Sequence, residues 1–445
     1  MAQKADLWRS IFRLIHVYAG IFIAPFIFIA AITGFFYAIT PQIEQWIYHD
    51  HLYVEKIHPH IQPLSQQLDA AHVQLSASAQ ITEVRPAPEP NQTTRVIFSD
   101  PQRHQYNQAI FIDPYTLKFK GQLAVYGTSG LLPFRTQLDH LHRDLLLGNW
   151  GRWYSELAVS WLGILVITGL YQWFRRRRIA KLEHNQRSLL IDRHSQIGLM
   201  LLPLLLFIAI TGLTWSQWAG QNIGVARQWL NWQTPILTTT LQKSMPAEMQ
   251  HHEHHMPDTA LHTLPQVSTD FDQVLMLAQR HGIDSTYLQI KPPSALQQAW
   301  TVAEIQRRWP TEADSVAIDL QQHKIIDHLS FNDYPLIAKL TRWGVDAHIG
   351  ILFGWVNQLI LVLYSLGLCG MIIYAFRAWS KASSLKQTTS QLVQQTRGVW
   401  KQATPQQKAI LCLTLSVLSL CLPLFGLSLI LAIIMLWFQK KPQFT

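Results

Sequence analysis

Four histidines at the ends of apolar stretches are the residues of this 445-residue chain best suited to chemistry. His16 recurs as His194 at an offset of 178 positions, and His142 recurs as His348 at an offset of 206. Their surroundings recur at the same offsets: Gly20, Pro25, Thr33 and Gly34 as Gly198, Pro203, Thr211 and Gly212, and Val96, Ile112, Asp113, Lys118, Leu123 and Gly148 as Val302, Ile318, Asp319, Lys324, Leu329 and Gly354. Repeated matches at two constant offsets predict a tandem duplication of helix, folded unit and helix.

The two offsets differ by 28 residues, which indicates an insertion in the second copy. This insertion is rich in imidazole and thioether groups: Met245, Met249, His251, His252, His254, His255 and Met256. Such ligands suit copper, and imidazole also suits zinc or nickel. The insertion is therefore interpreted either as a loop that binds copper or zinc through its four histidines, or as a flexible polar segment.

The composition indicates a membrane protein. Apolar residues make up 49% of the chain and charged residues only 14%, against roughly 25% charged residues in an average soluble domain. Four apolar runs, 15–39, 153–174, 197–218 and 349–376, are each long enough to cross a bilayer core of about 30 Å.

A fifth apolar run, 410–438, contains Pro423 and Gly426. Its halves are short for a bilayer, so one kinked span and a re-entrant hairpin are both open. The basic residues on both flanks, Lys408, Lys440 and Lys441, favour the hairpin.

Basic residues beside the apolar runs predict the orientation. Lys4, Arg9 and Arg13 precede the first run, Arg175 to Arg178 follow the second, and Arg377, Lys381 and Lys386 follow the fourth. These flanks are expected to be cytoplasmic, and the first run is expected to be an uncleaved anchor. The net charge of +9 is then an orientation signal, and no basic soluble module predicts nucleic-acid binding.

Each long connection predicts a small α+β unit. Helical spacing at 63–76 precedes strand patterns at 81–86, 93–98, 109–112 and 117–123, and the second copy repeats this at 271–281, 286–290, 299–304, 316–319 and 324–329. The expected division is 1–40, 138–175, 192–219 and 344–377 for the core membrane helices, 41–137 and 266–343 for the external domains, 220–265 for the insertion, 176–191 and 378–408 for cytoplasmic loops, and 409–438 for the C-terminal helix or hairpin.

The symmetric histidine pairs suit haem ligation. The duplication places His16 with His194 near the cytoplasmic face and His142 with His348 near the external face, so one macrocycle on the axis receives an imidazole from each copy. Two pairs imply two b-type haems with two histidine ligands each, because the three cysteines, Cys369, Cys412 and Cys421, form no C-x-x-C-H motif for covalent attachment. Gly20 and Gly198 leave room for a porphyrin.

Simpler interpretations stand beside this one. The histidines could cap or hydrogen-bond helix ends, and His140 is an alternative to His142, although its counterpart at the 206 offset is Asp346. The three Thr-Gly pairs, which begin at Thr33, Thr168 and Thr211, are interpreted as small residues for close helix packing.

These motifs together resemble a known family. The pattern Arg13-x-x-His16-x3-Gly20 with a later Thr33-Gly34, and the His142-Arg-Asp-Leu segment before the Thr168-Gly169 helix, resemble the PepSY-associated transmembrane family over roughly residues 8–378. The resemblance implies a four-helix core with pseudo-two-fold symmetry and two PepSY-like periplasmic domains in a bacterial inner membrane. The family includes iron-regulated membrane proteins and ferric-siderophore reductases.

The resemblance implies electron transfer from an unidentified reductase or quinol to a periplasmic acceptor, with ferric iron in a siderophore as the favoured acceptor. No residue is predicted to be catalytic, and membrane lipid is the expected surrounding. Two other functions remain open: a non-enzymatic PepSY-type binding or regulatory protein, and a transporter of haem, metal or chelate.

Overall fold

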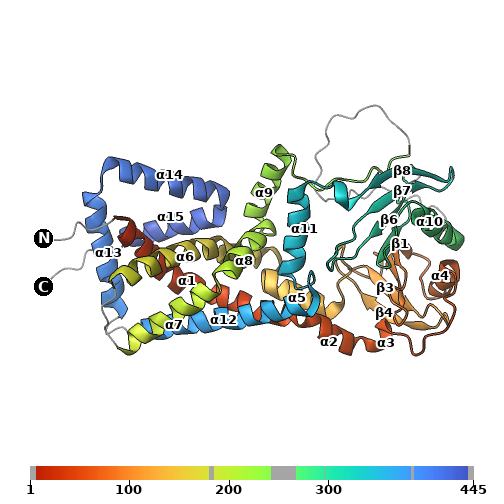
Figure 1. Ribbon diagram of the computed structural model, residues 1–445, viewed down its shortest axis with the longest axis horizontal. Coiled ribbons are helices and arrows are strands. Elements are labelled where there is room, and N and C mark those ends of the chain that lie inside the picture. The colour runs from red at the N-terminus through yellow and green to blue at the C-terminus, as the bar shows by residue number, and fades with distance from the viewer. Residues whose placement is uncertain (1–6, 180–184, 242–266, 296, 382–384, 439–445) are drawn as a thin grey trace.

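The computed structural model describes residues 7–179, 185–241, 267–295, 297–381 and 385–438. Long helices occupy one part of the molecule and the strands occupy the other, with α9 and α11 between them (Figure 1). We call the ends of the long helices that face the strands their sheet-side ends, and the opposite ends their far ends.

Three helices are long and apolar enough to cross a membrane: α1 (Leu7–Ala38), α6 (Arg152–Ile179) and α12 (Gly354–Ser380). The third predicted span is instead a pair of helices, α7 (Gln186–Met200) and α8 (Leu202–Thr214), bent by 64°. The described residues therefore contain three membrane-length helices, or four if the bent pair is one span.

The bend is a difference between the two copies of the duplication. Pro25 lies inside the continuous helix α1, whereas its counterpart Pro203 lies in the first turn of α8, directly after the break at Leu201. Proline lacks an N–H and is tolerated in a first turn, where that group has no partner within the helix. The equivalent proline thus lies within a continuous helix in the first copy and at the start of a new helix in the second copy.

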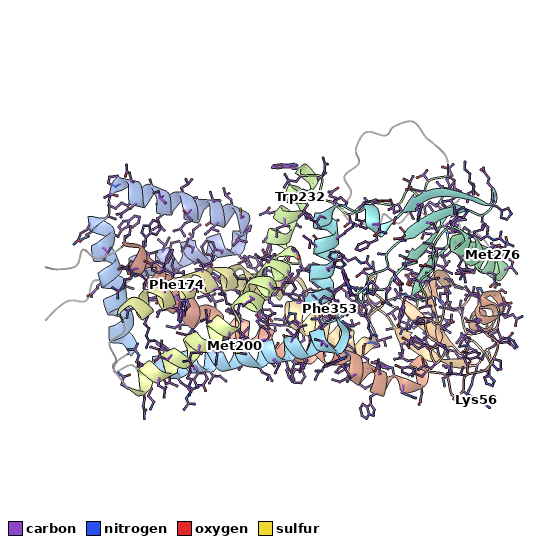
Figure 2. The ribbon with its side chains drawn as sticks, in the orientation of Figure 1. Lys56, Phe174, Met200, Trp232, Met276 and Phe353 are labelled. Carbon is purple, nitrogen blue, oxygen red and sulfur yellow. The ribbon has the colours of Figure 1, made fainter. Side chains whose placement is uncertain are left out.

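Helix packing and surface both suit a bilayer. α1 packs against α6 and α12, and its buried face carries the small residues Ala19, Ala24 and Ala31, which permit close approach of helices. Large apolar side chains point outward, among them Phe174 and Met200, which are 54% and 82% exposed (Figure 2). Several apolar helices with such a surface identify a multi-pass membrane protein.

The C-terminal apolar run folds as two helices, not one. After α13 (Leu385–Gln402), α14 (Pro405–Cys421) and α15 (Pro423–Phe438) lie side by side (Figure 1). α15 also docks on α6, where the Trp161 indole N–H donates to Ser428 Oγ over 2.9 Å and its ring meets Phe425 at 4.7 Å. The two helices thus form a helical hairpin, and its re-entrant placement in the membrane stays a prediction.

The strands form one antiparallel sheet in the order β4-β3-β2-β1-β5-β6-β7-β8. Their bounds are β1 Gln80–Arg85, β2 Thr94–Ser99, β3 Gln108–Ile112, β4 Phe119–Ala124, β5 Leu288–Lys291, β6 Trp300–Glu304, β7 Ser315–Asp319 and β8 Lys324–Leu329. The two copies join where Val84 of β1 pairs with Ile290 of β5. These residues are counterparts at the 206 offset, so the pseudo-two-fold axis passes between them.

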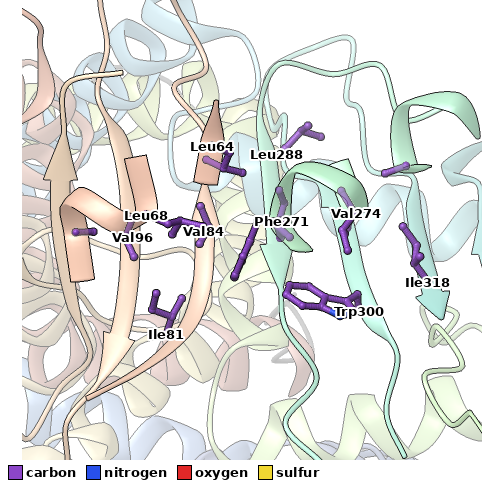
Figure 3. Packing of buried hydrophobic residues seen from close by; sticks show 14 of the residues in the cluster. Leu64, Leu68, Ile81, Val84, Val96, Phe271, Val274, Leu288, Trp300 and Ile318 are labelled. Carbon is purple, nitrogen blue, oxygen red and sulfur yellow. The ribbon is translucent and has the colours of Figure 1, made fainter. Parts of the chain in front are cut away.

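One hydrophobic core serves both copies of the folded unit. α4 (Leu64–His72) and α10 (Ser268–Arg280) lie against the sheet, and Figure 3 shows Leu68 and Val84 from the first copy near Phe271 from the second. The sequence predicted two similar units, and the structure adds that they share a sheet and a core.

Short helices connect the sheet to the long helices: α2 (Thr40–Ile47), α3 (His49–Leu52), α5 (Pro133–Asp144), η1 (Gly148–Trp150), α9 (Trp218–Trp229), η2 (Phe331–Asp333) and α11 (Leu336–His348). α5 packs against α1 and α6, and α11 packs against α8. These connectors place both copies of the folded unit at the sheet-side ends. The predicted loop ligands His251, His252, His254 and His255 lie outside the described residues, so this site stays a prediction.

Candidate functional site

The two far-end histidines face one large cavity. It has a volume of about 1280 Å³ and lies among α1, α6, α7 and α12, with His16 and His194 in its lining. The centroids of the two imidazole rings are 6.2 Å apart. Because a metal–imidazole bond is about 2 Å long, two rings at this separation can share one metal ion.

The hydrogen bonds of His16 fix which ring nitrogen is available. Its Nδ1 lies 3.1 Å from the Leu165 carbonyl and 3.2 Å from Thr168 Oγ1. The Thr168 hydroxyl proton is directed to the Ile164 carbonyl at 2.7 Å, so both neighbours of Nδ1 accept and Nδ1 must donate. Nε2 is then unprotonated in the neutral ring and offers its lone pair.

His194 repeats this arrangement in the second copy. Its Nδ1 lies 3.0 Å from the Met371 carbonyl, which can only accept. Met371 is the counterpart of Leu165 at the 206 offset, whereas the counterpart of Thr168 is Tyr374. The carbonyl contact is thus common to both copies, and the hydroxyl contact is found in the first copy alone.

The sheet-side histidines follow the same logic with threonine partners. His142 lies on α5 and His348 ends α11, so both are on the connectors that precede the spanning helices. Thr33 Oγ1 lies 2.8 Å from His142 Nδ1, and Thr211 Oγ1 lies 2.7 Å from His348 Nδ1. The two histidines are thus held at equivalent positions of the two copies by equivalent threonines.

Both threonine hydroxyls donate to their own helices. Thr33 donates to the Ile29 carbonyl at 2.9 Å and Thr211 to the Phe207 carbonyl at 2.8 Å. Each therefore accepts from the histidine Nδ1–H, a geometry that serine and threonine often adopt inside helices. All four histidines consequently share one tautomer, with Nε2 free to bind a metal.

The Thr-Gly pairs do more than the close packing predicted for them. A Cβ added at Gly169 would lie 2.8 Å from His16 Cε1, and one at Gly34 would lie 3.5 Å from His142 Cε1. Thr33, Thr168 and Thr211 each orient a histidine as described above. Sequence reasoning missed this role, although recurrence of Thr-Gly near the recurring histidines was the available signal.

His140 has a different environment from His142. Its Nδ1 lies 3.3 Å from Asp144 Oδ2 and 3.0 Å from Arg143 Nη2, within a charged cluster on α5. The counterpart of His140, Asp346, is fully buried and bonded by Arg307 Nε at 2.7 Å. Both positions thus belong to charged clusters beside the histidine pair, which leaves His142 as the residue equivalent to His348.

Basic residues surround the far-end cavity. Arg9, Arg13 and Arg187 line it together with Arg175 and Arg176. Arg176 is paired with Asp192 at 3.0 Å, whereas the buried Arg187 Nε has no hydrogen-bond partner in the described part of the chain. The arginines predicted to set orientation therefore also make one end of this cavity cationic.

The far-end cavity fits a haem in volume and donor chemistry. Its roughly 1280 Å³ exceeds the 300–1,000 Å³ typical of ligand pockets, its walls are largely apolar, and its two free imidazole nitrogens suit axial ligation of iron. Within the described ranges no group of three or more His, Cys, Asp or Glu residues forms a metal cluster. The donor sets present are therefore pairs of histidines.

Fold and site together define a class: multi-pass helical membrane proteins that hold paired histidines beneath a β-sheet domain. The model of the PepSY-associated TM region family matches residues 13–382, and the chain belongs to that family. No curated protein matches the chain.

Proposed function

We propose that the protein is a di-haem electron-transfer protein of the inner membrane that reduces a periplasmic acceptor. The observation that carries the proposal is the common tautomer of His16, His194, His142 and His348, in which Nδ1 is held and Nε2 is free. Histidines that merely cap helix ends have no need to present the same nitrogen in two symmetric pairs.

The chain's own residues have distinct roles in this proposal. The four histidines would ligate two b-type haems, and the threonine hydroxyls and backbone carbonyls would orient the rings and increase their basicity. Arg13 and Arg187 would neutralise the haem carboxylates at the far end of the cavity. Haem with two imidazole ligands supplies one-electron transfer without an open position for oxygen.

The direction and acceptor rest on the family resemblance and on charge. Basic flanks favour a cytoplasmic far end, which would place the sheet in the periplasm. A ferric siderophore is the favoured acceptor because hard oxygen chelators hold ferrous iron far less tightly than ferric iron. The electron donor would be a reductase or a quinol.

Absorption spectroscopy on the detergent-purified chain tests the haem assignment. Protein from haem-replete cells should show a Soret band, sharpened α and β bands with dithionite, and two haems per chain by the pyridine haemochrome assay. His16→Ala and His194→Ala should each remove one haem, and His142→Ala and His348→Ala the other. His140→Ala is the matched control and should retain both; colourless wild-type protein would refute the proposal.

Reoxidation tests the reductase assignment separately. Dithionite-reduced protein, freed of excess reductant, is mixed with ferrioxamine, ferric citrate or a ferric catecholate chelate under nitrogen. Oxidation of the haem spectrum with the appearance of ferrous iron is expected for at least one chelate. Full haem content without reoxidation by any of these chelates would leave the electron-transfer proposal in place but would refute a ferric siderophore as the acceptor.

A further inference from the structure

A second cavity lies at the sheet-side end, apart from the histidines. Its volume is about 230 Å³, and α2, α5 and the strand β2 contribute its charged residues, Glu44, Arg135 and Arg95. Gln45 and Ser129 line it and are exposed, so the cavity opens to the surface. Its other lining residues are Pro41, Leu52, Tyr53, Gln92, Gly130, Leu131 and Leu132.

Arg95 is a charged residue without a counter-ion. Among the residues that the structure describes, its guanidinium makes no ion pair and no hydrogen bond. Its Cζ lies over the Phe111 ring, 5.6 Å from the ring centroid. Burial, followed by the charge of Arg85, lowers the pKa of Arg95 to about 10. A guanidinium remains protonated at neutral pH even so, and a partly buried charge without a hydrogen bond is costly.

The neighbouring Arg85, unlike Arg95, has hydrogen-bond and ion-pair partners. Arg85 donates to the Ser129 and Thr128 carbonyls at 2.9 and 3.0 Å and pairs with Glu83. Arg95, on the next strand and directly opposite Arg85 in the register, is directed into the cavity lining instead.

Arg135 and Glu44 complete the charge of the cavity. Glu44 accepts the backbone N–H of Arg135 at 3.0 Å, while the Arg135 Nε and Nη2 atoms are buried without a partner in the described residues. With Glu44 ionised, two guanidinium groups face one carboxylate. The lining of the cavity then carries an excess positive charge.

The duplication shows that the fold does not require these arginines. Thr301 of β6 is the counterpart of Arg95, and Thr341 of α11 is the counterpart of Arg135. The second copy forms the equivalent strand pairs and connector helix with threonine at both positions. An excess positive charge that folding does not need points to a ligand.

We propose that this cavity binds one oxyanion group, a carboxylate or a phosphate, through Arg95 and Arg135. The proposal does not depend on haem. Arginine matches both oxyanions through paired N–H donors, and the volume suits a single small group. Two sources share this chemistry, a dissolved anion and a lipid headgroup. A headgroup is a candidate because α2, which contains Pro41, directly follows the membrane-length helix α1, and Trp46 of α2 is 81% exposed.

Calorimetric titration of the full chain in a neutral detergent tests the site, with inorganic phosphate and citrate as probes and chloride at matched ionic strength as reference. Saturable binding at one site per chain is expected for phosphate or citrate. Arg95→Gln should weaken it by at least about tenfold, because a charge-assisted hydrogen bond is lost. The matched control is Arg103→Gln, whose side chain is 66% exposed in the same unit.

A variant of opposite sign keeps the test valid if Arg95→Gln fails to fold. Glu44→Gln removes the only carboxylate of the cavity, and phosphate should then bind more tightly, by about three- to tenfold. Absence of saturable binding by the wild-type chain, or equal affinities in Arg95→Gln, Glu44→Gln and Arg103→Gln, would overturn the proposal.

Nanodiscs separate the two sources of the oxyanion. If dissolved anions are the ligand, phosphate binds equally in discs of phosphatidylcholine and of phosphatidylglycerol. If the ligand is a headgroup, anionic lipid competes with phosphate, and Arg95→Gln removes the competition. Either outcome supports an oxyanion site, whereas binding that is unchanged by Arg95→Gln in both discs contradicts it.

Discussion

Removing the hydroxyl of Thr33 or Thr211 is the sharpest perturbation of the histidine pairs. Thr33→Val and Thr211→Val keep side-chain shape and helix position but delete the acceptors that lie 2.8 and 2.7 Å from His142 and His348 Nδ1. The helix also loses a hydroxyl that donates to its own carbonyl, which costs little because the carbonyl keeps its helical partner. The main effect is therefore on the histidine.

The magnitude follows from the stranded donor. A buried N–H without a partner costs about 1–3 kcal/mol, and loss of an outer partner of a metal-binding histidine lowers affinity by about 10–100-fold. Thr211→Val should thus weaken haem binding at the sheet-side pair by roughly 10–100-fold, and Thr33→Val by less, because His142 also has the Ala30 carbonyl as a partner. Thr168→Val should have a smaller effect on the other pair, because His16 keeps the Leu165 carbonyl at 3.1 Å.

The assay is titration of haem into the apoprotein in detergent, followed by the Soret band. Thr414→Val is the matched control, since Thr414 is exposed and donates to the Ile410 carbonyl at 2.9 Å in the same way, with no histidine nearby in the described residues. The expected order of loss is Thr211→Val, then Thr33→Val and Thr168→Val, then Thr414→Val. Equal affinities for Thr211→Val and Thr414→Val would refute the tautomer argument.

Three further predictions test the far-end site, the oxyanion cavity and the sheet core. Gly169→Ala should lower haem retention by the far-end pair because its Cβ would lie 2.8 Å from His16 Cε1, whereas Gly163→Ala, with its nearest contact at 4.0 Å, should not; haemochrome counts decide. Burial raises the pKa of Glu44, so its neutral form persists above the usual acidic range. As the pH falls through that raised pKa, Glu44 loses its charge and the affinity of sulfate for Arg95 and Arg135 should rise. Calorimetry that finds no rise in affinity contradicts this prediction. Phe271→Ala, at a ring 4.8 Å from Trp300, should destabilise the sheet domain by about 3–5 kcal/mol in denaturant unfolding, against almost no change for the 80%-exposed Val73→Ala.

Local pattern and repetition predicted much of the fold. Strands expected at 93–98 and 324–329 appear as Thr94–Ser99 and Lys324–Leu329, because short runs rich in β-branched and aromatic residues specify a strand locally. The histidine pairs were predictable because a duplication transmits position: the offsets that align ordinary core residues also align His142 with His348.

The joining of the strands of the two copies into one sheet could not be predicted from local pattern. Val84 and Ile290 each predict a buried strand, but nothing in either segment states that its free edge meets the other. Edge pairing depends on long-range geometry, and an unprotected apolar edge can pair with any compatible strand. The break at Leu201 is similar, because the same Pro-containing pattern gave a continuous helix around Pro25.

Comparison of the two copies separates what the fold requires from what the sites require. The Leu165 and Met371 carbonyls hold His16 and His194 in the same way, and Thr33 and Thr211 hold His142 and His348 in the same way. Both copies keep these contacts although the chain between them differs by a 28-residue insertion, as the proposed haem on the shared axis would require. Arg95 and Arg135 differ from their threonine counterparts and lie off that axis, so a ligand bound there would meet only the first copy. Under the two proposals, the histidines on the axis would hold a symmetric cofactor and the arginines off the axis would hold an asymmetric partner.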